Sequence, residues 1–478
     1  MINLLLKVFD LKFNNKYLLF SFLFFLLFLF SYFISLQGLL AWDEVVYLAN
    51  ARSYIGDSFF VEDFRFPLLS AVIGGVWLLT GEFVIVAQLL MILFSLGSVL
   101  VFYFVAKYFL SDDLSLLASL IFGFSLQFIT WGFRIYTDIL GVLLFLLAFL
   151  FFLKHEEIKN KFVTKGYFFV FLAGLFSGLA FSARLSTIIV SFVLVIFFLL
   201  RKNWFRNLLF YGSGFLLAII PWLIHGLIKK GHPLYFALSQ TSAILEYTAR
   251  ESPLILLRFL LAEYGLALLL ILFNVLYFFK FWKRGFNKKF YSKTSLLLLV
   301  LSSQLLFYFF FVKLKLARYI LEMSPFIVLL IVLGFNVVLL LTNNKYKDLM
   351  FVFLLIVLFV SIFLTSIHGI NDLIKTSKCT SSGALHQSIS LIKEISEPGQ
   401  LIVSSVWPYF GYYANLEAYS PWSVNMSDYF MSYDPDFFAF SEQAGIPFLG
   451  VVNHSQVHEL FYISDSCGWD LTVYEVRD

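Results

Sequence analysis

The chain has 478 residues, of which 61% are hydrophobic and 13% are charged, and its formal net charge is +4. An ordinary soluble protein is about 45–50% apolar and about 25% charged. This composition excludes a soluble enzyme, a disordered chain and a nucleic-acid-binding module, and it predicts a membrane protein with several spans. The two cysteines are too few for a disulfide-stabilised scaffold.

The first hydrophobic stretch, residues 17–40, follows Lys7, Lys12 and Lys16. It is longer than the apolar core of a signal peptide, which has about 7–15 residues, and no small-residue cleavage site follows it. We therefore expect a retained transmembrane helix whose basic end faces the cytoplasm.

Further hydrophobic stretches predict a helical bundle. They cover residues 67–80, 83–109, 114–130, 135–153, 167–182, 186–200, 208–228, 254–280, 294–312, 322–341 and 348–367. The stretch at 67–80 is too short for a hydrocarbon core of about 30 Å at about 1.5 Å per residue. We expect it to lie in or dip into the outer leaflet, which leaves about eleven transmembrane helices.

Basic residues cluster in four of the connections and predict the orientation. These connections are residues 154–166, 201–207, 280–293 and 342–348. Because lysine and arginine are retained in cytoplasmic loops, all four are expected on the same side as the N-terminus. The chain is then a multi-pass protein of the cell membrane with its C-terminus extracytoplasmic.

The composition changes after about residue 367. Strands are predicted at 401–406, 447–452 and 471–476, and helices at 384–395 and 436–443. The expected fold is mainly α: a transmembrane domain over residues 1–367, with its first outer loop at 41–82, and a small extracytoplasmic α/β domain over 368–478.

Carboxylates open the first outer loop. Asp43 and Glu44 follow the first span directly, where partial desolvation suits a catalytic base that serves a membrane-bound substrate. The alternative is that they favour a helix dipole. At the end of the same loop, Arg65 is a candidate phosphate ligand, and the alternative is snorkelling to the lipid headgroups.

Three further charges lie near the ends of later spans. Asp138 begins an apolar stretch, and an ionisable group at that depth is a functional candidate. Its alternative is an ion pair with Arg134, four residues earlier. Arg134 and Arg184 are possible substrate-binding residues, and the alternative for Arg184 is snorkelling.

A cation cluster precedes the stretch at 322–341. Lys313, Lys315 and Arg318, with Tyr319 beside them, are expected on the outer side, against the usual bias of basic residues. Such a cluster requires an anionic partner, and phosphate suits arginine geometry. The alternative partner is an acidic lipid headgroup.

Acids and cations gathered on one face of a bundle fit a phosphorylated lipid donor. Cations would neutralise a phosphate leaving group while a carboxylate deprotonates an acceptor hydroxyl. A transporter of lipid-linked sugars and a non-catalytic surface-assembly protein are the competing classes. The sequence lacks the two related halves with broken helices that many transporters show.

At these residues the chain resembles the GT-C superfamily of polyprenyl-phosphate-sugar glycosyltransferases, chiefly protein O-mannosyltransferases and lipid A aminoarabinose transferases. The matching pieces are Asp43-Glu44, Arg65-Phe66-Pro67, Arg134 to Asp138, Gly178 to Arg184, and Arg318 to Leu321 with Pro325. The resemblance implies inverting transfer of one sugar from a dolichyl-type phosphate to a hydroxyl on a protein, glycan or lipid.

The resemblance also implies roles for particular residues. Asp43 would be the base or the acceptor-orienting acid, with Glu44 beside it, and Asp138 would be a second acid at the cavity. Arg65 and the group Lys313, Lys315, Arg318 and Tyr319 would hold the donor phosphate.

The chain departs from the family pattern in one respect that bears on cofactors. The Trp-Trp-Asp-Tyr-Gly motif of oligosaccharyltransferases is absent, which argues against transfer of a whole oligosaccharide. No cofactor is expected, and a divalent metal is possible but not favoured. The expected partners are a lipid-linked sugar, the acceptor and membrane lipids, with no nucleic acid.

Overall fold

The computed structural model describes residues 15–56, 61–62, 65–158, 163–201, 203–246, 251–282, 288–380, 383–419, 435–440, 457–464 and 470–476. The chain divides into two compact units. The helical unit comprises Met1–Tyr32 and Leu89–Asn371, and the sheet unit comprises Phe33–Gln88 and Asp372–Asp478. The sheet unit therefore joins the first predicted loop to the C-terminal tail.

The helical unit is built from helices that follow the hydrophobic stretches. In chain order they are α2 (Asn15–Leu36, ending in the sheet unit), α5 (Val84–Ala106, beginning in the sheet unit), α6 (Asp112–Gly123), α7 (Leu126–Trp131), α8 (Thr137–Ile158), α9 (Val163–Ala183), η1 (Leu185–Thr187), α10 (Ile188–Leu199), α11 (Trp204–Lys230), α12 (Tyr235–Glu246), α13 (Leu254–Tyr264), η2 (Gly265–Ala267), α14 (Leu268–Trp282), α15 (Lys288–Phe310), α16 (Tyr319–Leu341), η3 (Asn344–Tyr346) and α17 (Lys347–Thr380, ending in the sheet unit).

The core of this unit lies on α8 and α16, whose residues are mostly buried. The ring of Phe326 on α16 stacks on Phe145 at 5.7 Å between centroids and meets Phe149 edge-on at 5.5 Å. Aromatic pairs of this kind add to the free energy of burial. Both helices carry an acidic residue in the first turn, Asp138 on α8 and Glu322 on α16.

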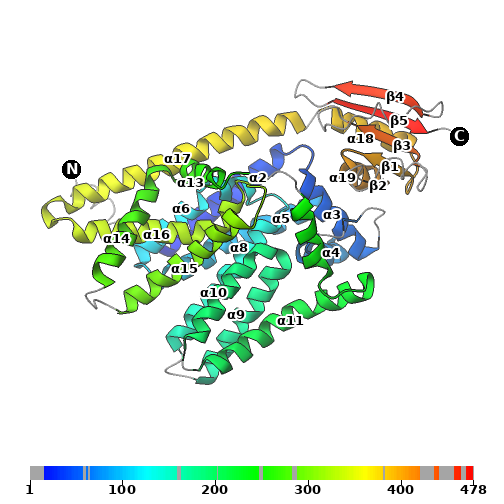
Figure 1. Ribbon diagram of the computed structural model, residues 1–478. Helices are drawn as coiled ribbons and strands as arrows, with labels where there is room; N and C mark the ends of the chain where they lie inside the picture. Colours follow the sequence, from blue (N-terminus) through cyan, green and yellow to red (C-terminus); the bar gives the residue numbers. More distant parts are fainter. Residues whose placement is uncertain are drawn as a thin grey trace. The chain divides into compact units, whose positions relative to one another are not determined.

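Glycines bring α9 and α11 into close contact, and Figure 1 shows the two helices side by side with α10. A Cβ atom added at Gly174 on α9 would lie 1.9 Å from the carbonyl oxygen of Tyr211 on α11. One added at Gly214 on α11 would lie 2.1 Å from the carbonyl oxygen of Phe171. Small residues at both positions let the backbones approach, as at many contacts between membrane helices.

Eight helices of the described residues are long and apolar enough to cross a membrane. Three of the eleven stretches that were expected to cross the membrane do not form, within the described residues, a single apolar helix of sufficient length. Residues 185–199 and 294–310 form shorter apolar helices, and the stretch at 114–130 is divided into α6 and α7 by a break at Phe124 and Ser125. The short helix α4 (Leu68–Thr80) matches the expected short stretch at 67–80.

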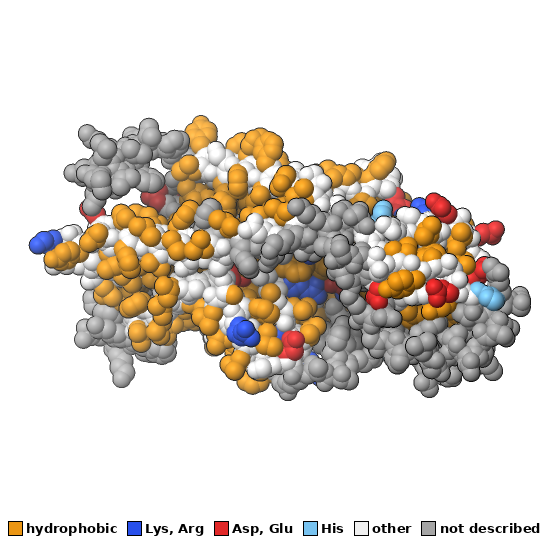
Figure 2. Space-filling model, turned by 90° about the horizontal axis from the view of Figure 1, so that it is seen from above, with side chains coloured by type: hydrophobic (Ala, Val, Ile, Leu, Met, Phe, Trp, Pro, Cys, Tyr) orange, Lys and Arg blue, Asp and Glu red, His pale blue; other side chains and the backbone are white. Residues whose placement is uncertain are grey.

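The outer surface of the helical unit is apolar. Figure 2 shows hydrophobic side chains spread over its described face with few charges among them. Many large side chains that point outward are Leu, Ile and Phe. A contiguous apolar surface of this extent suits contact with lipid rather than water.

The sheet unit combines helices from both ends of the chain with a five-stranded sheet. Its elements are α3 (Trp42–Ile55), α4, α18 (Ala384–Ile395), β1 (Leu401–Ser404), α19 (Trp407–Tyr409), η4 (Phe410–Ala414), β2 (Glu417–Tyr419), β3 (Phe437–Phe440), β4 (Val457–Ser464) and β5 (Asp470–Val476). The strand order is β2-β1-β3-β5-β4. Strand β1 pairs in parallel with β2 and β3, while β5 pairs antiparallel with β3 and β4.

The helices and strands predicted for the tail differ in how they compare with the structure. The helix at 384–395 and the strands at 401–406 and 471–476 are confirmed as α18, β1 and β5. The predicted helix at 436–443 is wrong, because Phe437–Phe440 forms β3, a central strand whose four residues are all buried. A short apolar run buried on both faces is typical of such a strand. The predicted strand at 447–452 lies outside the described residues.

Replacing a glycine of α9 tests the close contact between α9 and α11. We expect Gly174→Ala to lower the midpoint of thermal unfolding by several degrees, because the new methyl group would overlap the Tyr211 carbonyl. Gly212→Ala, with open space around its Cβ position, is the matched control and should be neutral or slightly stabilising. Equal midpoints for the two variants would contradict the close contact.

Candidate functional site

The residues singled out in the sequence fall into the two units. Asp43, Glu44 and Arg65 belong to the sheet unit, and the remaining candidates belong to the helical unit.

In the sheet unit, an arginine bridges two carboxylates. Arg65 Nη2 lies 2.7 Å from Asp43 Oδ1, and Arg65 Nε lies 2.7 Å from Glu62 Oε2. Their side chains are only 8–15% exposed, so the charges are partly desolvated and interact more strongly than surface pairs. Asp43 is thereby held in one orientation at the start of α3.

The loop residue Glu62 is fixed by helix α3. The side chain of Asn50 accepts a hydrogen bond from the Glu62 amide at 2.8 Å and donates one to the Glu62 carbonyl at 3.0 Å. Burial raises the pKa of the Glu62 carboxyl, and Arg65 opposes that shift. Burial works against the charged form of Arg65 as well, but Asp43 and Glu62 raise its pKa well above its usual value. The arginine therefore stays protonated and keeps both acids close.

The Glu44 side chain makes different contacts from that of Asp43. Its side chain is fully buried, and Oε2 accepts hydrogen bonds from the Ala41 amide at 2.7 Å and from the Gln37 amide group at 2.9 Å. This is the acidic half of a helix capping box. The structure thus favours the helix-terminus interpretation for Glu44, whereas Asp43 turns toward Arg65.

The tail packs against the helix that carries Asp43. Trp42 meets Trp407 edge-on at 4.5 Å between ring centroids, and the Leu40 amide donates to the Tyr413 hydroxyl at 3.3 Å. Arg52 forms an ion pair with Glu82, donates to the Tyr412 carbonyl at 2.7 Å and lies over the Tyr412 ring. Both ends of α3 are therefore held by residues more than 350 positions away along the chain.

In the helical unit, a second arginine bridges two carboxylates. Arg184 Nη1 lies 2.6 Å from Asp138 Oδ1, and Arg184 Nε forms an ion pair with Glu322. The Asp138 and Glu322 side chains are 1% and 0% exposed, and that of Arg184 is 12% exposed. Asp138 therefore pairs with Arg184 rather than with Arg134, and Arg184 does not snorkel.

Glu322 is surrounded by donors that the sequence analysis did not assign to the site. The Tyr308 hydroxyl donates to Glu322 Oε2 at 2.8 Å, and the Ser186 hydroxyl donates to Oε1 at 2.7 Å. The signal that could have identified Glu322 was present, because it is an acid in the first turn of a strongly apolar stretch.

Two further arginines gather on one aromatic group. Arg318 lies over the rings of Trp131 and Tyr136 at 5.9 and 5.1 Å from their centroids, and Arg134 lies over Trp131 at 4.9 Å. Tyr319 lies beneath Arg184 at 5.4 Å. Aromatic faces stabilise guanidinium groups, so Trp131 and Tyr136 hold the two arginines close together.

Lys315 has a structural role that the sequence did not predict. Its side chain is 2% exposed, and its ammonium group donates to the carbonyls of Tyr308, Phe309 and Val312 at the end of α15. Cations at a helix C-terminus satisfy its last carbonyls in this way. The Lys313 carbonyl accepts a hydrogen bond from the Glu251 amide at 3.1 Å, which ties the same loop to the chain before α13.

Among the residues that the structure describes, no three His, Cys, Asp or Glu side chains are grouped so that they could hold a metal ion. The charged clusters described above are mixed arginine–carboxylate groups.

The fold resembles those of solved proteins along most of the chain. ArnT from Cupriavidus metallidurans bound to undecaprenyl phosphate superposes with a TM-score of 0.68 at 13% identity, covering 96% of this chain and 98% of that one. The archaeal oligosaccharyltransferase AglB from Archaeoglobus fulgidus superposes with a TM-score of 0.61 at 13% identity, covering 91% and 70%. The chain therefore has the GT-C fold of a multi-pass membrane protein.

One family model matches part of the chain. Residues 65–225 match the family of dolichyl-phosphate-mannose-protein mannosyltransferases. The matched segment begins at Arg65 and includes Asp138 and Arg184. No curated protein sequence matches the chain significantly.

Removing Arg184 tests whether the buried ionic group supports the fold. We expect Arg184→Gln to reduce the free energy of unfolding by about 3–5 kcal/mol, because two buried carboxylates would lose their counter-charge. The measurement is denaturant or thermal unfolding of the purified protein. Adding Asp138→Asn to this variant should recover part of the loss.

Arg134→Gln is the matched control for this experiment, because Arg134 contacts an aromatic ring and its loss should cost at most about 2 kcal/mol. Wild-type stability of the Arg184 variant would show that the buried ionic group does not support the fold.

Proposed function

We propose that the protein is a membrane glycosyltransferase that moves a single sugar from a polyprenyl phosphate, of the dolichyl type, to a hydroxyl group on a protein, glycan or lipid. The main support is the likeness along nearly the whole chain to ArnT, which was solved with undecaprenyl phosphate. Mannose is the proposed sugar, supported by the description of the family matched at residues 65–225.

We assign the role of base to Asp43. Its carboxylate lies in the first turn of α3 and is 15% exposed, so it is oriented by Arg65 yet open to a substrate. In the proposed step the acceptor oxygen attacks the anomeric carbon, the bond between that carbon and the phosphate oxygen breaks, and the hydroxyl proton passes to Asp43. The products are the inverted glycoside and the polyprenyl phosphate.

We assign the donor phosphate to Arg318, with Arg134, Tyr319 and Lys313 in support. Guanidinium groups stacked on aromatic rings keep their charge and their planar donors, which suits phosphate. Arg65 and Lys315 were also expected at the phosphate, but Arg65 bridges two acids and Lys315 caps α15. We therefore propose that Arg65 orients Asp43 and that Lys315 has a structural role.

We assign structural roles to Asp138 and Glu44. Asp138 is buried against Arg184, so it would fix that arginine and the helices around it rather than exchange protons. Glu44 holds the start of α3 and so the direction of Asp43. The basic connections support a cytoplasmic N-terminus and an extracytoplasmic tail, and the reaction is proposed to proceed without a metal.

Replacing the proposed base tests the mechanism. We expect Asp43→Asn to lower kcat by about 10²- to 10⁴-fold, because the amide cannot accept the hydroxyl proton. Transfer is measured with labelled polyprenyl-phosphate mannose. Asp113→Asn is a matched control, since Asp113 also lies in the first turn of a helix and is exposed. Near-normal turnover by the Asp43 variant would remove it from the mechanism.

Replacing the proposed phosphate ligand tests donor recognition. We expect Arg318→Ala to weaken donor binding by about tenfold to a hundredfold, the range for hydrogen bonds to charged groups, with acceptor affinity unchanged. Arg318→Lys should restore part of the affinity. Arg258→Ala, which removes an exposed arginine on α13, should have no effect. An equal loss of acceptor affinity would contradict the assignment.

A further inference from the structure

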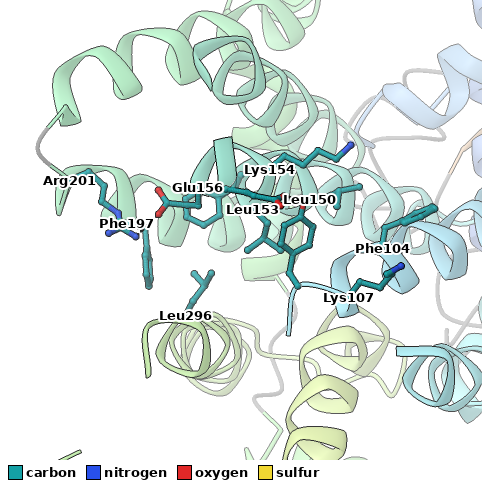
Figure 3. Close-up of a pocket in the computed structure, with 12 residues that line it drawn as sticks. Phe104, Lys107, Leu150, Leu153, Lys154, Glu156, Phe197, Arg201 and Leu296 are labelled. Atoms are coloured by element: carbon teal, nitrogen blue, oxygen red, sulfur yellow. Dashed lines mark hydrogen bonds and ion pairs between the residues drawn. The ribbon is translucent and has the colours of Figure 1, made fainter. Parts of the chain in front are cut away.

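A cavity of about 990 Å³ lies at one end of the helical unit. The last turns of α8, the ends of α5 and α10 and one side of α15 line it, and Figure 3 shows Leu296 of α15 facing the side chains of α8 across the hollow. Lys154 on its lining follows Asp138 by 16 residues on the same helix. At about 1.5 Å per residue, the cavity is about 24 Å from the buried Asp138–Arg184 pair.

Part of the cavity lining is apolar. Phe104, Leu150, Phe197 and Leu296 contribute to it. Phe104 is also 46% exposed on the outer surface of α5, a helix long and apolar enough to cross the membrane. The apolar lining is therefore continuous with a surface suited to lipid, and an acyl chain could enter without passing through water.

The edge of the cavity carries three cations. Arg201 Nη2 pairs with Glu156 Oε2 at 2.7 Å, and Lys107 Nζ pairs with the exposed Asp112 at 3.0 Å. The Lys154 ammonium lies over the rings of Phe151 and Phe169. Among the described residues, no carboxylate pairs with Lys154, so its charge is available to an anion.

One further group at the edge favours a particular headgroup. Glu157 accepts a hydrogen bond from the Tyr108 hydroxyl at 3.2 Å and remains exposed. A carboxylate beside a cation suits a ligand that carries both a phosphate and hydroxyl donors. Phosphatidylglycerol has this combination, with acyl chains that match the apolar lining.

The place of the cavity agrees with a lipid of the inner leaflet. It lies where α8 and α10 lead into the basic connections 154–166 and 201–207. These connections are the ones expected in the cytoplasm, and anionic lipids attract basic residues at that surface. A soluble anion would leave the apolar lining in contact with water.

We propose that this cavity binds an anionic glycerophospholipid of the phosphatidylglycerol type. Its phosphate contacts Lys154 and Lys107, its hydroxyl groups reach Glu157, and an acyl chain lies along Phe104 and Leu296. The site is separate from the buried Asp138–Arg184 pair, and it stands whether or not the protein transfers a sugar.

The test uses the purified full-length protein and measures retained lipid by native mass spectrometry during titration with phosphatidylglycerol or phosphatidylcholine. Phosphatidylglycerol should bind more tightly. Lys154→Gln should weaken its binding about fivefold, the effect of one cation near a membrane surface. Adding Lys107→Gln should weaken it further. Lys345→Gln is the matched control, because Lys345 is exposed and also lies over an aromatic ring, and it should bind like the wild type.

Three results would overturn the proposal. Equal affinity for phosphatidylcholine would show that the headgroup charge is not recognised. Competition by millimolar inorganic phosphate would indicate a site for a soluble anion. An equal loss in the Lys345 and Lys154 variants would indicate general attraction to the surface rather than binding in the cavity.

Discussion

The neutralisation of Arg184 by Asp138 and Glu322 is the constraint on which the helical unit depends. The three charges come from the start of α8, the junction of α9 with η1, and the start of α16. A buried charge without its partner is far more costly than any single apolar contact. Helices α8 and α16 are the most buried helices of the unit, and each has an acid in its first turn. These acids are tolerated there because both pair with Arg184.

The sheet unit repeats the same arrangement with other residues. Arg65 stands between Asp43 and Glu62 as Arg184 stands between Asp138 and Glu322. The difference lies in burial, because Asp43 is 15% exposed whereas Glu322 is 0% exposed. The same kind of pairing therefore leaves one acid partly open to solvent and seals the other inside the helical bundle.

The sequence predicted most of the long helices because their apolar stretches are close to or above the length of a bilayer crossing, and it singled out Asp43, Arg65, Asp138 and Arg184. It did not predict their partners. Arg134 lies four residues before Asp138 along the chain, whereas the partner in the structure, Arg184, lies at the junction of α9 with η1. Short apolar runs were the other source of error. The run Phe437–Phe440 is a strand, and its length and composition alone do not distinguish a buried strand from a buried helix.

The contacts of Trp42 and Arg52 with the tail have a consequence for engineering. The Arg52 guanidinium and the Tyr412 carbonyl that it contacts are 360 residues apart along the chain, yet both belong to a single compact unit. Chimeras that exchange the tail between proteins of this fold would separate Trp42 from Trp407 unless residues 41–82 were exchanged too. The smallest transplantable module is therefore discontinuous, and it contains the helix that bears Asp43.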